Sequence, residues 1–160
     1  VLARRFGRGW LSHLAECGAV MKMHPIHPAI VHFPVACWSL AVLADAASLI
    51  FGQTAWQWAG GLLAVGCAMA LLAAGAGLWE LRRVPEGPAM QDALWHMGLM
   101  LSAFCLFTAR LLVGVADMQF IAPNALAFAL DALGFITLMV GGWMGGKLVY
   151  THGIGQSTAN

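Results

Sequence analysis

Four long apolar stretches dominate the chain, and polar residues gather in the short segments between them. The apolar stretches are residues 28–51, 55–81, 89–116 and 123–150. Each exceeds the roughly 20 residues that an α-helix needs to cross the hydrocarbon layer of a membrane. They are continuously apolar, whereas the strands of a membrane barrel alternate between apolar and polar positions. Because short connections make successive helices antiparallel neighbours, the pattern predicts an all-α integral membrane protein, folded as an up-down four-helix bundle.

The segment before these stretches follows a different pattern. Phe6, Trp10 and Leu14 recur at helical spacing, with three arginines close by. This combination is typical of a short amphipathic helix that lies on a membrane surface. We therefore expect three parts: an amphipathic segment at residues 1–23, a four-helix domain at 24–155 and a tail at 156–160.

Proline and glycine inside the apolar stretches bear on how the helices pack. Pro34 should kink the first helix, because proline has no N–H to donate to the preceding turn. Glycines are dense in the second and fourth helices, as in the segment GGWMGG at residues 141–146. Small residues let membrane helices approach closely, and they would equally leave room for a flat cofactor between helices. The sequence leaves both interpretations open.

Composition supports a membrane environment and excludes one class of partner. Hydrophobic residues make up 61% of the chain and charged residues 9%, with a mean hydropathy of +0.78. A soluble domain carries roughly a quarter charged residues, so the lipid bilayer is the expected surrounding. The net charge of +1 gives no indication of a nucleic-acid partner.

The distribution of lysine and arginine predicts the orientation in the membrane. With four spans, both termini and the loop after the second helix share one side. That side carries seven of the eight basic residues, and the eighth, Arg110, lies within the third helix. Because cytoplasmic segments are enriched in lysine and arginine, both termini are expected in the cytoplasm.

The histidines gather at this predicted cytoplasmic face. Those that border or enter the helices are His24, His27, His32, His96 and His152. Ionisable side chains inside a membrane are costly and by default indicate function. The first and third helices of an up-down bundle are diagonal, with axes roughly 13 Å apart. That separation would let His32 and His96 ligate the iron of haem b from opposite sides, with His27 and His152 as reserve ligands.

Two other interpretations of the histidines stay open. Imidazole also binds zinc, copper and nickel, so a transition-metal site could use His24, His27 and His32 together with His96 or His152. Alternatively, the histidines bind no cofactor and contact lipid phosphates at the membrane surface. The chain would then be an accessory subunit of a membrane complex.

Three charged residues lie at a similar depth near the opposite face. Asp45, Arg110 and Asp131 each fall roughly 7–12 Å from the outer helix ends, at 1.5 Å per residue. A buried ionic cluster of this kind either locks helices together or forms a proton or quinone site. The sequence has no Ser-His-Asp pattern, Walker loop, dinucleotide fingerprint or CxxC motif. Nothing therefore identifies the chain as an enzyme with a self-contained catalytic site.

The segment HPIHPAIVHFPVA at residues 24–36 resembles the opening of a bacterial membrane family called domain of unknown function 2231. That family shows an HPxHPxxVHFP opening, four hydrophobic spans, a histidine in the third span and a YxxGxG ending. The corresponding features here are His96 and the ending YTHGIG, which begins at Tyr150. The resemblance covers residues 24–155 and implies a four-span protein of the bacterial inner membrane. It also implies association with redox domains such as Rieske-type iron–sulfur modules.

The sequence as a whole favours a b-type cytochrome-like electron-transfer subunit. It would exchange electrons with a quinone or with the other subunits of a larger redox complex. The rival interpretations are the cofactor-free accessory subunit and the histidine-based metal-binding protein described above.

Overall fold

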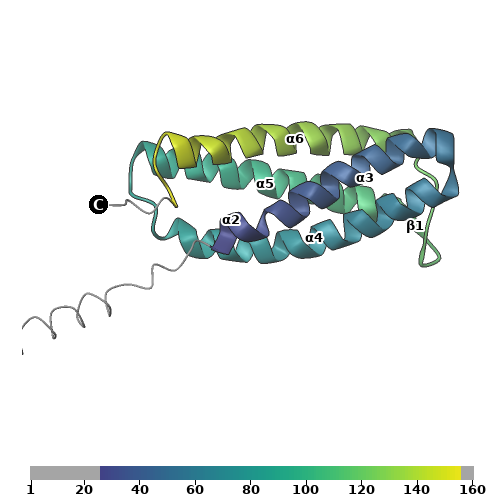
Figure 1. The fold of residues 1–160 in the computed structure, drawn as a ribbon, viewed down its shortest axis with the longest axis horizontal. Coiled ribbons are helices and arrows are strands. Elements are labelled where there is room, and N and C mark those ends of the chain that lie inside the picture. The colour runs from purple at the N-terminus through teal and green to yellow at the C-terminus, as the bar shows by residue number, and fades with distance from the viewer. Residues whose placement is uncertain (1–25, 156–160) are drawn as a thin grey trace, which may run out of the picture.

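A computed structural model describes residues 26–155, which form a four-helix bundle (Figure 1). The elements in chain order are α2 (Ile26–Ile30), α3 (His32–Phe51), α4 (Gln53–Leu81), α5 (Pro88–Val113), β1 (Val115–Ala116), β2 (Gln119–Phe120) and α6 (Ala125–Tyr150). The predicted all-α bundle is confirmed, with one short hairpin of strands added. The amphipathic segment predicted for residues 1–23, His24 and the tail at 156–160 lie outside the described residues.

Four helices are long and apolar enough to cross a membrane, and their ends agree closely with those of the predicted spans. They cover Ile26–Phe51, Gln53–Leu81, Pro88–Val113 and Ala125–Tyr150. The first span contains both α2 and α3, which meet at Val31. This break lies one turn before Pro34, where the missing N–H of proline leaves the carbonyl of Ile30 without its helical partner. The helix is therefore interrupted close to where Pro34 predicts a disturbance, and Val31 separates the short helix α2 from the rest of the span.

A tight β-hairpin replaces the last turn predicted for the third helix. Val115 pairs with Phe120, and Ala116 pairs with Gln119. The two turn residues, Asp117 and Met118, have φ angles of 49° and 59°. Left-handed conformations at both central positions are typical of a type I′ turn, whose twist matches that of the strands it joins. Helix α5 therefore ends at Val113 instead of residue 116.

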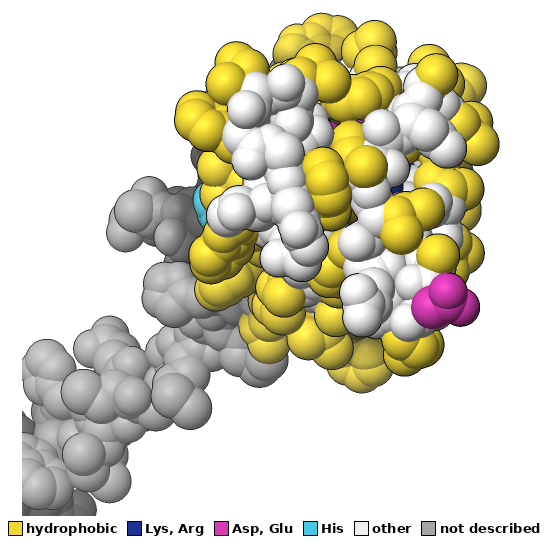
Figure 2. All heavy atoms as spheres, turned by 90° about the vertical axis from the view of Figure 1, so that its right-hand side faces the viewer, with side chains coloured by type: hydrophobic (Ala, Val, Ile, Leu, Met, Phe, Trp, Pro, Cys, Tyr) yellow, Lys and Arg dark blue, Asp and Glu magenta, His cyan; other side chains and the backbone are white. Residues whose placement is uncertain are grey.

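The bundle consists of two helical hairpins that pack against each other. Helix α3 lies against α4 along its length, and α5 lies against α6 in the same way. Between the hairpins is a core of residues from all four spans: Trp38, Ala41, Leu63, Cys67, Ala70, Ala103, Phe107 and Leu138. Most large apolar side chains face outward instead, and Ile50 for example is 82% exposed. Figure 2 views the end away from the described chain ends and shows hydrophobic side chains around most of its visible periphery.

An apolar outer surface around a small core is the arrangement expected of a protein surrounded by lipid, which offers no hydrogen bonds to polar groups. The chain is thus a multi-pass membrane protein with four candidate spans. Residues 26 and 155 and the loop between α4 and α5 lie at one end of the bundle (Figure 1). The β-hairpin and Gly52 lie at the other end.

Candidate functional site

Two imidazole rings face each other near the end of the bundle that holds the described chain ends. They belong to His27 of α2 and His96 of α5, and their ring centroids are 6.4 Å apart. The ring planes are nearly perpendicular, at 83°. Both side chains are half-buried. The first and third spans thus each contribute one histidine to a single site.

A backbone carbonyl fixes each of these rings. His27 Nδ1 lies 2.8 Å from the carbonyl oxygen of Ala73 in α4, and His96 Nδ1 lies 2.8 Å from that of Gly141 in α6. A carbonyl oxygen can only accept, so in both rings Nδ1 must carry the proton and donate it. In a neutral imidazole this leaves Nε2 as the nitrogen with a free lone pair. Both nitrogens of each ring lie close to the anchoring helix, since a Cβ atom at Gly77 would be 3.6 Å from His27 Nε2 and one at Gly145 would be 3.8 Å from His96 Nε2.

Glycines make room for both rings. A Cβ atom at Gly77 would lie 3.0 Å from His27 Cε1, and a Cβ atom at Gly145 would lie 3.0 Å from His96 Cε1. Each glycine stands one turn after the carbonyl that accepts from the ring. The start of α2 has a further anchor, because the backbone N–H of His27 donates to Glu80 Oε1 at 3.1 Å. The site is therefore shaped by the helices behind the histidines as much as by the histidines themselves.

The two histidines occupy equivalent positions in the two helical hairpins. The interval along the chain from His27 to His96 is the same as the interval from Trp38 to Phe107. Trp38 and Phe107 stack at the centre of the bundle with ring centroids 4.8 Å apart and planes at 18°. When a twofold axis relates the two hairpins, a residue of one hairpin can contact the equivalent residue of the other only if both lie near the axis. The histidine pair and the aromatic pair therefore mark a pseudo-twofold axis along the bundle.

The helices behind these side chains repeat in the same way, with one common interval between equivalent positions. The equivalent pairs are Ala73 and Gly141, Gly77 and Gly145, and Gly66 and Gly134. The last pair lies behind the aromatic stack, where added Cβ atoms would lie 2.7 Å from Trp38 Cδ1 and 3.0 Å from Phe107 Cζ. The same arrangement therefore occurs in both hairpins: a ring from the first helix of the hairpin packs on a glycine of the second helix.

A buried ion cluster lies toward the opposite end of the bundle. Arg110 Nη2 donates to Asp45 Oδ2, and Arg110 Nε donates to Asp131 Oδ2 at 3.3 Å. At most 3% of each of these residues is exposed. The cluster joins α3, α5 and α6, so it connects the two hairpins far from the histidine pair.

The sequence matches the model of one known protein family. A family model described as "Predicted membrane protein (DUF2231)" matches residues 23–158. The chain belongs to the DUF2231 family. The match confirms the resemblance drawn from HPIHPAIVHFPVA and YTHGIG, and it spans all four helices of this DUF2231 protein. Neither a comparison with curated proteins nor one with solved structures gave a match.

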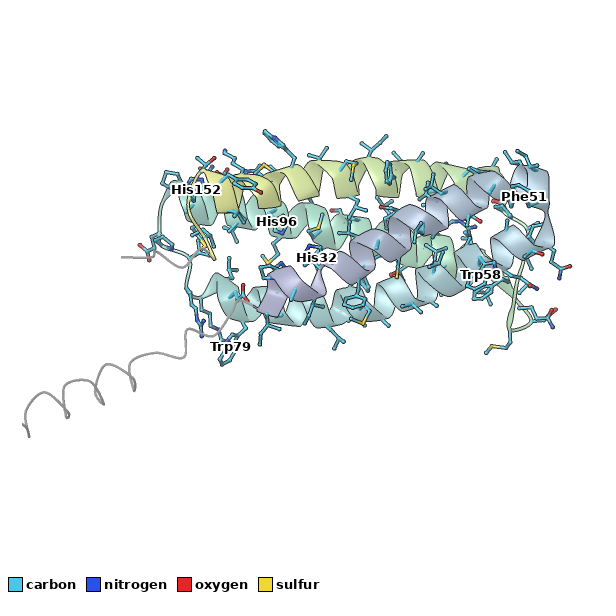
Figure 3. All side chains as sticks on the ribbon, viewed as in Figure 1. His32, Phe51, Trp58, Trp79, His96 and His152 are labelled. Carbon is cyan, nitrogen blue, oxygen red and sulfur yellow. The ribbon has the colours of Figure 1, made fainter. Side chains whose placement is uncertain are left out.

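The histidine that faces His96 in this DUF2231 protein is His27, which the sequence offered only as a reserve ligand. His32, the predicted partner, is exposed on α3. His32 follows His27 by more than one helical turn of 3.6 residues and less than two, so the two side chains point to different sides of a helix. Figure 3 labels His32, His96 and His152 in the half of the bundle that holds the described chain ends.

His152 has a different partner. Its Nε2 lies 2.7 Å from Asp92 Oδ2, and Lys147 Nζ lies 2.9 Å from the same oxygen. Asp92 therefore fastens the segment after α6 to the start of α5. Sequence reasoning missed both Asp92 and Glu80. The i, i+4 spacing of Asp92 and His96, which places both on one face of α5, was the available signal.

The transition-metal site predicted from His24, His27, His32 and His96 is not assembled within residues 26–155. In this range, no group of three or more His, Cys, Asp or Glu side chains is arranged to hold a metal ion. His24 lies outside the described residues. The geometry of the described part therefore offers two facing imidazoles, and a metal bound there would need its other ligands from elsewhere.

Proposed function

We propose that this DUF2231 protein is a b-type cytochrome-like electron-transfer subunit that binds haem b through Nε2 of His27 and His96. The observation that carries the proposal is the facing pair of imidazoles, each with Nδ1 held by a carbonyl. Haem iron ligated by two imidazoles supplies reversible one-electron transfer. The chain's own contribution is to hold and orient the two ligands.

The separation of the rings fits ligation of one iron. Imidazole nitrogens bind metals at about 2.0–2.1 Å, so two rings on opposite faces of a haem have centroids roughly 6 Å apart. The rings of His27 and His96 are 6.4 Å apart. Nearly perpendicular ring planes suit this role, since each imidazole can rotate about its bond to the metal.

The hydrogen bonds of the rings also fit. A histidine that ligates a metal almost always donates its other ring N–H to a carbonyl or carboxylate, which fixes the tautomer and the ring orientation. Ala73 and Gly141 supply such carbonyls. Two protein ligands are sufficient for haem, because the macrocycle occupies the other four positions of the iron. The same two imidazoles would be an incomplete set for zinc, which is usually bound by three or four protein groups.

The repeat of the two hairpins agrees with this arrangement. His27 and His96 are equivalent residues, and equivalent residues approach an axis from opposite sides. The two histidines that would hold the haem are thus like side chains in like surroundings. The sequence features that place these rings are two glycines, Gly77 and Gly145, at equivalent positions.

The charge distribution favours a site near the cytoplasmic face of the bacterial inner membrane. Arg82, Arg83 and Lys147 lie at the same end of the bundle as the histidine pair, and cytoplasmic segments carry the excess of basic residues. The implied partners are a quinone or the subunits of a larger redox complex. A single haem near one face would need such a partner to complete electron transfer across the membrane.

The test is the visible spectrum of the detergent-purified protein, dithionite-reduced minus oxidised, after expression with sufficient haem. We expect the narrow α-band of low-spin haem b and close to one haem per chain. A featureless spectrum from well-folded protein would overturn the proposal. The rival would then be the cofactor-free accessory subunit, in which His27 and His96 serve only to tie helices together.

A further inference from the structure

The way Arg110 holds its two carboxylates is unusual. The Nε and Nη2 hydrogens of a guanidinium form one fork, which typically takes the two oxygens of a single carboxylate. In this protein the two donors of that fork go to different residues, Asp45 and Asp131. The two acceptor oxygens therefore bind neighbouring nitrogens of one guanidinium. Both carboxyl groups thus contact the same guanidinium.

One oxygen of each carboxyl group has no hydrogen-bond partner among the described residues. These atoms are Asp45 Oδ1 and Asp131 Oδ1, and both are fully buried. A buried polar atom without a partner loses the hydrogen bonds it made to water, at a cost of roughly 1–3 kcal/mol for a neutral group and more for a charged one. A proton on either carboxyl group would turn an acceptor into a donor, and one O–H could then satisfy both groups.

The net charge of the cluster also favours a proton on one of the carboxyl groups. Two ionised carboxylates and one guanidinium would leave a net charge of −1 in a nearly completely buried site. Carboxylates that share a site rarely ionise together, because their repulsion in a medium of low dielectric constant is large. A single proton makes the cluster neutral.

No other charged group of the described residues offsets this charge. Helix α3 contributes Asp45, and the nearby Ser48 hydroxyl donates to the Asp45 carbonyl instead of to a carboxylate. Helix α5 contributes Arg110, and α6 contributes Asp131. Helix α4 has Glu80 as its one charged residue, at the far end. The nearest titratable group of α4 is Cys67, which accepts from the Thr108 hydroxyl at 3.7 Å.

The repeat shows that these charges are not a requirement of the fold at this level. In the equivalent hairpin, the positions of Arg110 and Asp131 are occupied by Ala41 and Leu63, both fully buried. The equivalent of Asp45 is Gly114, whose lack of a side chain makes room for Arg110 Nη1. Each charged residue of the cluster thus has an uncharged residue at its equivalent position in the other hairpin.

We propose that Asp45 and Asp131 share one bound proton beside Arg110, and that this cluster is a proton-binding site near the end of the bundle opposite the histidine pair. Along α5, Arg110 lies roughly 21 Å of helix beyond His96, at about 1.5 Å per residue. The site is therefore separate from the proposed haem site. It does not depend on haem being bound.

The experiment is an infrared difference measurement on the full chain in detergent or nanodiscs at neutral pH, comparing wild type with single variants. A protonated carboxylic acid has a C=O stretching band that an ionised carboxylate lacks. We expect this band in the wild type and its loss in both Asp131→Asn and Asp45→Asn, because the remaining aspartate then ionises against Arg110. Asp92→Asn and Glu80→Gln are the matched controls and should retain the band. Absence of a protonated carboxyl band in the wild type, or its retention in both cluster variants, would overturn the proposal.

Thermal unfolding provides a second test that does not depend on assigning a band. Each single Asp→Asn variant keeps the cluster neutral, so its Tm should stay within a few degrees of the wild type. The double variant leaves Arg110 buried without a counter-ion, and we expect its Tm to fall by about 10 °C or more. If each single variant instead raised the Tm clearly above that of the wild type, the wild-type cluster would carry two ionised carboxylates and the shared proton would be absent. Both measurements give the same answer whether or not haem is present.

Discussion

The histidine site depends on which nitrogen of each ring is free. His27 and His96 both donate from Nδ1 to a carbonyl, so in both neutral rings Nε2 is the nitrogen with a free lone pair. A histidine whose carbonyl partner was removed could rotate about its side-chain bonds and lose this orientation. The glycine under each ring leaves room for the ring against its anchoring helix, and this contact can be changed without altering the ligands.

The glycines under the rings should therefore be sensitive to a single added methyl group. In Gly77→Ala and Gly145→Ala, the new Cβ would lie 3.0 Å from a ring carbon, closer than van der Waals contact. We expect a loss of about 1–3 kcal/mol of stability from overpacking and a lower haem content per purified chain. Unfolding temperature and haem-to-protein ratio would be measured together.

Two glycines of the same helices provide the controls for this pair. Gly75 and Gly142 have nothing within 4 Å of an added Cβ. Gly75→Ala and Gly142→Ala should be neutral or stabilising by about 0.5–1 kcal/mol, since alanine favours helix over glycine. If all four variants behaved alike, the rings would not be held by Gly77 and Gly145.

At the scale of elements, hydrophobic length located the four spans, because a membrane requires long apolar helices whatever their packing. It could not locate the hairpin at residues 115–120, whose apolar residues look like a continuation of the third helix. Pro34 predicted a disturbance of the first helix near Val31, but it did not predict where His27 would lie. The short helix α2 packs beside α4, where His27 bonds to the Ala73 carbonyl, whereas depth alone had favoured His32.

The turn of the β-hairpin contains strain that a substitution can relieve. Asp117 and Met118 both have left-handed φ angles, which cost a residue with a side chain roughly 1–2 kcal/mol relative to glycine. Met118 is 95% exposed, so its side chain makes little contact that would be lost. Met118→Gly should stabilise the protein by up to about 1 kcal/mol, measured as a rise in Tm. Met118→Ala removes the side chain without relieving the backbone and should give no rise.

At the scale of the whole molecule, the protein is a pair of equivalent hairpins with one symmetric and one asymmetric site. The histidine pair and the Trp38–Phe107 stack obey the pseudo-twofold axis, and the ion cluster does not. The interval that relates His27 to His96 and Trp38 to Phe107 is present in the sequence. The sequence alone does not reveal this interval as a repeat, because most other equivalent positions hold different residues. The contacts within the two pairs of rings show that it relates equivalent residues.

The orientation predicted for the whole molecule can be tested with cysteine labelling. In a background that lacks the native cysteines, Met118→Cys would place a thiol at the tip of the hairpin and Gly87→Cys would place one in the loop before α5. If the termini are cytoplasmic, an impermeant maleimide should label Met118→Cys in intact spheroplasts and Gly87→Cys only after the membrane is permeabilised. The reverse pattern would contradict the proposed orientation and would place the histidine pair at the outer face.

The most direct test of the account compares three histidine variants by the reduced-minus-oxidised spectrum and the haem content. We predict that His27→Ala and His96→Ala each lose the low-spin haem b spectrum, and that His32→Ala retains it. His96→Gly should recover the spectrum when imidazole is added, because free imidazole can occupy the space of the missing ligand, and a purely structural role would give no such recovery. Retention of the spectrum in His27→Ala together with its loss in His32→Ala would contradict the geometry on which the proposed site is built.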